Sequence, residues 1–201
     1  MFFFGLLAQA RDPIGQMIGV SAVAAVGALI GGVQASLILA PADDPAFELV
    51  LAAPRPLAMI LIERLIVLFV MNAAIAGIGA VLFDLAMPSG ETVIDQLARW
   101  LPPFTAMVGL GMTIAIVGKK SGLGVLLVLL LVGAMLFGGF AFLALFDQAW
   151  VLHLFIPVDQ FSAEQVLINR AALTGIGLAL IGYCFRLLRN TEILLNAHLS
   201  A

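Results

Sequence analysis

The strongest candidate for phosphate chemistry in the chain is the run GKKSG at residues 118–122. A phosphate loop requires G-x-x-x-x-G-K-[ST], because backbone N–H groups hold the phosphates while an adjacent lysine and hydroxyl complete the site. Lys119 follows Gly118 as required, but Lys120 stands where the hydroxyl should be and Thr113 where the first glycine should be. The run therefore predicts a basic turn, and we expect the chain itself not to hydrolyse ATP.

Nucleophiles and metal ligands are too sparse to indicate a catalytic or metal site. His153 and His198 are far apart in the sequence, and no H-E-x-x-H pattern places two imidazoles on one helical face. Cys184 is the single cysteine, so it can form neither an internal disulfide nor a cysteine cluster for a metal. The sequence predicts no catalytic residue, no metal and no cofactor, and an enzyme is the least favoured class of function.

The elements that must position any functional residue are long apolar runs. Hydrophobic residues make up 63% of the chain and charged residues only 10%, whereas soluble domains carry about 25% charged residues. A membrane span needs about 17–25 mainly apolar residues and must be helical in lipid. Five runs qualify, at residues 16–40, 57–83, 101–118, 122–146 and 165–188. We therefore expect an all-α polytopic transmembrane bundle that forms one domain over residues 1–201.

Few polar residues lie within these runs. Glu63 and Arg64 are near the start of the second run, where both can extend to water, so the simplest interpretation is an interfacial pair with no special role. Asn72 lies deeper in the same run and either hydrogen-bonds a neighbouring helix, which we favour, or lines a pathway. Gly27 and Gly31 form a G-x-x-x-G pattern, which is a weak signal in a glycine-rich span.

The placement of lysine and arginine predicts the orientation of the bundle, because cytoplasmic loops are enriched in both. With residues 41–56 in the cytoplasm, that side holds Arg55, Arg64, Lys119, Lys120, Arg186 and Arg189, against Arg11, Arg99 and Arg170 on the other side. The C-terminus is then cytoplasmic. The cations form no continuous stripe, so nucleic acid is not an expected partner.

The two predicted outer loops carry amphipathic or aromatic segments. Residues 89–100 space Val93, Ile94, Leu97 and Trp100 as one helical face, which predicts a short helix lying along the membrane surface. Residues 148–161 are rich in aromatics that suit the boundary between membrane and water, and we expect them to be partly helical. A capping box formed by Ser162 and Gln165 is expected to start the last helix.

The polar segment ADDPAFELVLAAPRP, residues 42–56, separates the first two runs. Asp44 suits a helix N-cap and Glu48 lies in the first turn, where a negative charge is favourable. Phe47, Val50 and Leu51 share one helical face, and the prolines that follow end the helix. The pattern predicts a short amphipathic helix between two spans, which either rests on lipid or contacts a protein partner.

Three parts of the sequence resemble ABC transporter permeases of the type-2, exporter-like family. They are FELVLAAPRPLAMILIERL at 47–65, LPPFTAMVGLGMTIAIVGKKSG at 101–122 and NRAALTGIGLALIGYCFRLLRNTEILL at 169–195. The resemblance extends over residues 17–195. In that family a short helix with a glutamate ends at a proline and is followed by a basic residue near the foot of the next span. Glu48, Pro54 and Arg64 occupy those positions here.

The resemblance implies that residues 42–56 form a coupling helix that docks on a separate cytosolic ATPase. The implied interface consists of Asp44, Phe47, Glu48, Val50, Leu51 and Arg55, and Glu63 and Arg64 would transmit its movement to the spans. It also implies a second permease copy or a homologous partner, export of a substrate, and a bacterial plasma membrane location.

The resemblance is incomplete at the N-terminal side, because family members usually have six spans and the sequence predicts five. Residues 1–8 are apolar but too short to cross a membrane, and they are either an interfacial segment or the remnant of a first span. The alternative function is a non-transporting subunit that anchors or stabilises a larger membrane complex through the same helices.

Overall fold

A computed structural model describes residues 13–38, 57–86, 92–145, 149–154 and 161–188 of the chain. Within these ranges the chain forms five α-helices and one 3-10 helix and contains no strand. The helices are α2 (Pro13–Ile38), α4 (Leu57–Ala86), α5 (Val93–Val117), α6 (Ser121–Leu145), η2 (Ala149–Leu152) and α7 (Ala163–Leu188). The predicted all-α architecture is confirmed, whereas the predicted coupling helix lies outside the described residues.

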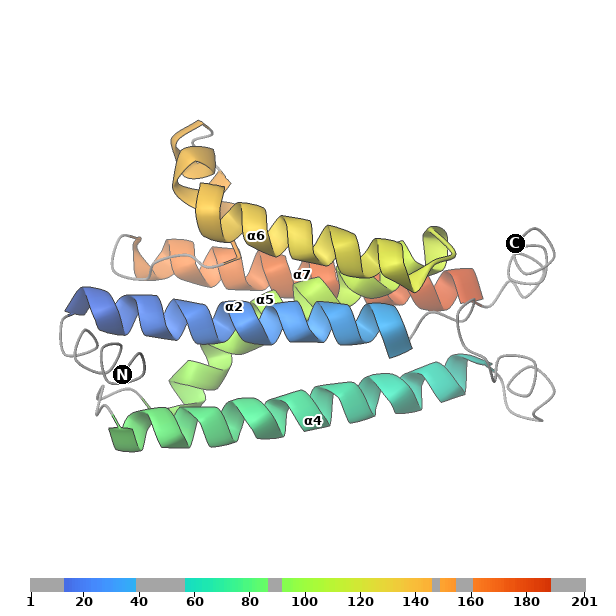
Figure 1. Cartoon of the computed structure of the whole chain (residues 1–201), viewed down its shortest axis with the longest axis horizontal. Coiled ribbons are helices and arrows are strands. Elements are labelled where there is room, and N and C mark those ends of the chain that lie inside the picture. Colours follow the sequence, from blue (N-terminus) through green and yellow to red (C-terminus); the bar gives the residue numbers. More distant parts are fainter. Residues whose placement is uncertain (1–12, 39–56, 87–91, 146–148, 155–160, 189–201) are drawn as a thin grey trace.

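Successive α-helices run antiparallel along the long axis of the molecule (Figure 1). As a result, Ile38, Leu57, the turn between α5 and α6, and Leu188 all lie at one end of the bundle. Three helical segments are long and apolar enough to cross a membrane, namely Ala58–Leu82, Ile94–Val117 and Ala163–Leu188. The described apolar parts of α2 and α6 are shorter, so three of the five predicted spans meet this criterion within the described residues.

Helix α5 is the centre of the bundle and contacts α2, α4, α6 and α7. In its apolar core segment 72% of the residues are buried, compared with 17% in α4. Phe104, Val108 and Met112 lie one turn apart on α5 and are almost fully enclosed. Helix α4, in contrast, exposes a long apolar face, which is the arrangement expected where lipid or another chain covers it.

Glycines allow the helices next to α5 to approach it closely. Gly27 and Gly31 of α2 face the rings of Trp100 and Phe104, so the G-x-x-x-G pattern packs against aromatic side chains. On the other side, a methyl group on Gly109 would lie 2.6 Å from the carbonyl oxygen of Gly177 in α7. Small residues of this kind draw membrane helices together because they let backbones approach one another.

The start of α5 differs from the prediction for residues 89–100. No separate surface helix ends before Leu101, because α5 begins at Val93 and continues through Pro102 and Pro103. Thr92 caps the helix: its Oγ1 accepts a hydrogen bond from the Asp95 N–H at 3.2 Å, and the Asp95 carboxylate accepts from the Thr92 N–H at 3.2 Å. This capping box places the helix start upstream of the prolines, so the span predicted from residue 101 begins earlier.

The predicted start of α7 is confirmed. The Ser162 hydroxyl accepts a hydrogen bond from the Gln165 N–H at 3.2 Å, and the Gln165 side chain accepts from the Ser162 N–H at 3.0 Å. The two bonds satisfy N–H groups that have no partner within the helix. In the preceding segment, the predicted partial helicity is confirmed only for η2, Ala149–Leu152, because residues 155–160 lie outside the described residues.

Candidate binding groove between α2 and α4

The residues of the predicted ATPase-coupling interface lie outside the described residues. They are Asp44, Phe47, Glu48, Val50, Leu51 and Arg55. Their flanking residues are described, however, and Ile38 and Leu57 lie at the same end of the bundle (Figure 1). We call this end the basic end because four described cations lie at or near it, namely Arg64, Lys119, Lys120 and Arg186.

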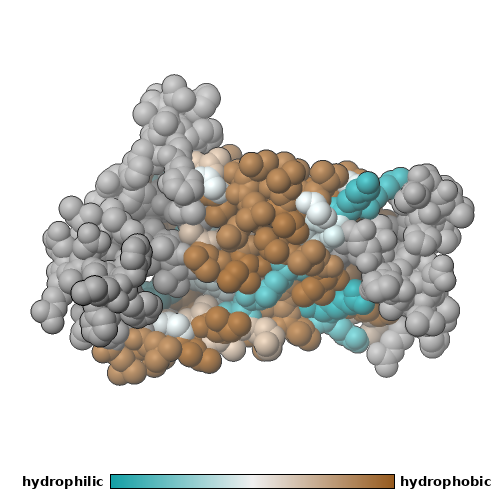
Figure 2. Space-filling view, viewed as in Figure 1, coloured by the Kyte–Doolittle hydropathy of each residue, from teal (hydrophilic) through white to brown (hydrophobic). Residues whose placement is uncertain are grey.

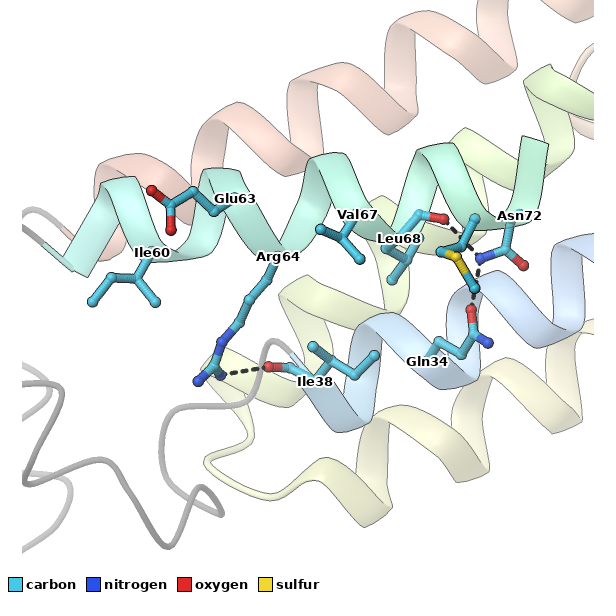
Figure 3. Close-up of a pocket in the computed structure, with 9 residues that line it drawn as sticks. Gln34, Ile38, Ile60, Glu63, Arg64, Val67, Leu68 and Asn72 are labelled. Carbon is cyan, nitrogen blue, oxygen red and sulfur yellow. Dashed lines mark hydrogen bonds between the residues drawn. The ribbon is translucent and has the colours of Figure 1, made fainter. Parts of the chain in front are cut away.

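Arg64 connects the two helices that flank residues 39–56. Its Nη1 donates a hydrogen bond of 3.0 Å to the carbonyl oxygen of Ile38, the last residue of α2 (Figure 3). The last carbonyl groups of a helix lack partners within it, and a cation is favourable there because it complements the helix dipole. Arg64 of α4 therefore holds the end of α2.

Glu63 precedes Arg64 on α4, but the two side chains extend in different directions in Figure 3. Consecutive residues of an α-helix do not face each other, since each is rotated by about 100° from the last. Glu63 is exposed and Arg64 is half-buried, yet both line the space between α2 and α4. The two opposite charges therefore border one cavity.

Asn72 forms the second polar link between α2 and α4. Its Nδ2 donates to Oε1 of Gln34 at 2.7 Å and to the carbonyl oxygen of Leu68 at 2.8 Å (Figure 3). Asn72 is only 6% exposed. The favoured prediction that Asn72 hydrogen-bonds a neighbouring helix is confirmed, and the residue lines the cavity as well.

Between these two links lies a groove of about 480 Å³, which we call the α2–α4 groove. Its lining residues are Gln34, Ile38, Ile60, Glu63, Arg64, Val67, Leu68, Met71 and Asn72. The walls are mainly apolar, with charged groups toward the basic end and two amides at the other end. In Figure 2, hydrophilic patches lie between α2 and α4 on a surface that is otherwise mainly hydrophobic. Sequence reasoning identified Glu63, Arg64 and Asn72 but missed Gln34.

The turn between α5 and α6 brings two lysines to the basic end. Gly118 ends α5, and its N–H donates to the carbonyl oxygen of Ile114 at 2.7 Å. Lys119 then adopts φ 57°, a left-handed conformation that costs an L-residue free energy, before α6 begins at Ser121. The basic turn predicted at residues 118–122 is thus confirmed.

Asn169 is a structural residue that sequence reasoning missed. It is 2% exposed, and its Nδ2 lies 2.8–3.0 Å from the carbonyl oxygens of Trp150, Val151 and His153. These contacts fix η2 against the first turns of α7. The sequence did carry a signal for this role: a single asparagine near the start of an apolar helix needs a hydrogen-bond partner when it is buried. His153 is itself buried.

No protein-family model, curated protein or solved structure matches the chain. In the part of the chain that the structure describes, no group of three or more histidine, cysteine, aspartate or glutamate side chains could hold a metal ion.

Proposed function

We propose that the chain is the membrane-spanning permease subunit of an ABC transporter, and that a separate cytosolic ATPase supplies its energy. The proposal includes a dimer with a second copy or a homologous permease, and export as the direction of transport. One observation carries it: Ile38 and Leu57, the described helix ends that flank the polar segment 42–56, both lie at the basic end of the bundle.

The charge distribution supports a cytoplasmic location for this end. Four described cations, Arg64, Lys119, Lys120 and Arg186, lie at or near the basic end, compared with Arg99 and Arg170 near the opposite end. Short loops rich in lysine and arginine remain in the cytoplasm when a membrane protein inserts. An amphipathic helix in residues 42–56 would then face the compartment that contains ATPases.

The link from Arg64 to Ile38 supports a role in transmitting movement. Residues 39–56 join the end of α2 to the start of α4, and this hydrogen bond links the end of α2 to Arg64, in the first part of α4. A force on the segment would therefore act on both helices at once. Helix α4 is the least buried of the three candidate spans, so it can shift relative to α5 with little loss of packing.

The tight packing of α2, α5 and α7 indicates where a translocation path could form. Gly32 lies against Gly111, and Gly109 lies against Gly177, so the backbones of these three helices nearly touch. A translocation path between α2, α5 and α7 would require these helices to separate and all of these contacts to break. We therefore place the path between two permease chains, with the exposed face of α4 or α6 available for the second chain.

The proposal is tested by placing a charge on the predicted docking face. We expect Val50→Asp to abolish co-purification of an ATP-hydrolysing subunit, because an unpaired charge in a protein contact costs about 2 kcal/mol or more. Ala52→Asp is the matched control, since it adds the same charge on the opposite face of the predicted helix. Both variants should reach the membrane at the level of the unmodified chain.

Equal recovery of the ATPase with the two variants would contradict the docking assignment. If the chain instead co-purifies with a complex that lacks an ATPase, and both variants retain that complex, an anchoring subunit becomes the better interpretation. Quantitative mass spectrometry of the purified complex, with membrane abundance as the reference, distinguishes these results.

A further inference from the structure

The α2–α4 groove contains hydrogen-bonding groups that the described residues do not use. Asn72 donates to Oε1 of Gln34, so the Gln34 amide is fixed with its oxygen toward Asn72 and its NH2 turned away from that bond (Figure 3). Among the described residues, this NH2 has no hydrogen-bond partner, and neither has the Oδ1 atom of Asn72. Both side chains line the groove, and a polar group without a partner is costly in lipid.

The other end of the groove offers two opposite charges. Glu63 and Arg64 are consecutive on α4 and both line the groove, toward the basic end. A guanidinium has five N–H donors in a fork that suits phosphate oxygens, and a carboxylate accepts hydrogen bonds from an ammonium group. A ligand that carries a phosphate and an ammonium group joined by a short flexible linker therefore matches this pair in charge.

The spacing between the charged and amide ends fits the polar part of a phospholipid. Arg64 is held at Ile38, and Gln34 lies one helical turn deeper on α2, about 6 Å along the axis. The headgroup and interfacial zone of a bilayer leaflet is roughly 5–7 Å thick, judged from a total thickness of about 40–45 Å and a hydrocarbon core of about 30 Å. A lipid phosphate at Arg64 would thus place its acyl ester near the level of Gln34.

The rest of the groove is suited to a hydrocarbon chain. Val67 and Met71 line it and are largely exposed, so they are accessible from the surrounding bilayer without an opening movement. Leu68 forms the buried apolar wall behind them. The volume of about 480 Å³ is within the range of small-molecule binding sites, so the groove can hold part of a lipid such as one acyl chain and its ester.

We propose that the α2–α4 groove binds one zwitterionic glycerophospholipid of the ethanolamine type, taken from the bilayer leaflet at the basic end. The phosphate lies at Arg64 and the ammonium group at Glu63. The ester carbonyl accepts a hydrogen bond from the Gln34 NH2, and one acyl chain runs along Val67 and Met71. The site requires a membrane around the bundle but does not depend on the proposed ATPase, so either proposal can fail without the other.

The test is native mass spectrometry of the full chain, purified from vesicles that contain equal amounts of phosphatidylethanolamine, phosphatidylglycerol and phosphatidylcholine. We expect one retained lipid per chain, with phosphatidylethanolamine preferred. Arg64→Gln should lower its retention about tenfold, the factor expected for loss of a charge-assisted hydrogen bond. Lys120→Gln removes the same charge at the same end, outside the groove, and should leave retention unchanged. Glu63→Gln should shift the preference toward phosphatidylglycerol.

A second pair of variants tests the apolar part of the site. Val67 and Val70 are both 61% exposed on α4, but only Val67 lines the groove. Val67→Trp should fill the groove and displace the lipid, whereas Val70→Trp should have no effect on retention. Equal retention of the three lipids by the unmodified chain, or equal effects within either matched pair, would overturn the proposal.

Discussion

Replacement of Gly177 by alanine should force α5 and α7 apart. A Cβ atom at this position would lie 2.5 Å from the carbonyl oxygen and 2.6 Å from the carbonyl carbon of Thr105, and 2.8 Å from the backbone nitrogen of Ala106. The shortest contact falls about 0.9 Å short of the 3.4 Å at which ordinary van der Waals contact begins. The obstructing atoms all belong to the backbone of α5, so no side chain can rotate away, and the helices must move.

The expected loss of stability is estimated by comparison with Gly175 on the same helix. A methyl group added at Gly175 would have no neighbouring atom within 4 Å. Both changes gain the helix propensity of alanine over glycine, about 0.8–1 kcal/mol, so this contribution cancels in the comparison. Overpacking of a close contact typically costs about 1–3 kcal/mol. We therefore expect Gly177→Ala to be less stable than Gly175→Ala by about 1–3 kcal/mol.

Reversible unfolding of the two variants in mixed micelles measures this difference directly. The unmodified chain provides the reference, and helix content before unfolding shows whether each variant reaches the native state. A difference of less than about 0.5 kcal/mol, or a lower stability for Gly175→Ala, would refute the close approach of α5 and α7.

Two further predictions concern the basic turn and the polar link between α2 and α4. Lys119→Gly should raise the free energy of unfolding by about 0.5–1 kcal/mol, because glycine adopts the left-handed conformation at φ 57° without the strain that a side chain causes. Thermal denaturation should show no comparable gain in stability for Lys120→Gly. Asn72→Leu should lower the free energy of unfolding by about 0.6–1.7 kcal/mol, because it removes the hydrogen bond to Gln34. Denaturation of Ala73→Leu, a change at an exposed neighbour, provides the control, and equal losses would contradict the structural role of Asn72.

The positions of the helices could be predicted from the sequence because each apolar run is long and bounded by polar or proline-rich segments. The start of α5 could not, since Pro102 and Pro103 suggest the beginning of a span. Prolines favour the first turn of a helix, but here the helix begins at the Thr92–Asp95 capping box. The same kind of pattern at Ser162 and Gln165 is easier to recognise because glutamine is a usual partner in that motif.

The groove was only partly predictable for a different reason. A polar residue in an apolar run needs a partner, so Asn72 could be expected to bond another helix. Which helix supplies that partner depends on contacts between residues far apart in the chain, and Gln34 lies 38 positions away. The contact between Arg64 and Ile38 likewise depends on how the helices pack, because the hydrophobic periodicity of α4 does not predict where α2 ends.

Site-specific photo-crosslinking tests most directly whether residues 42–56 dock on a cytosolic ATPase, as we propose. A photoreactive side chain at Val50 should crosslink in intact membranes to a subunit with a nucleotide-binding phosphate loop, and the yield should change when ATP is bound or hydrolysed. The same probe at Ala52, on the opposite face of the predicted helix, should give little crosslinked product. Crosslinking to lipid alone from both positions would contradict the account.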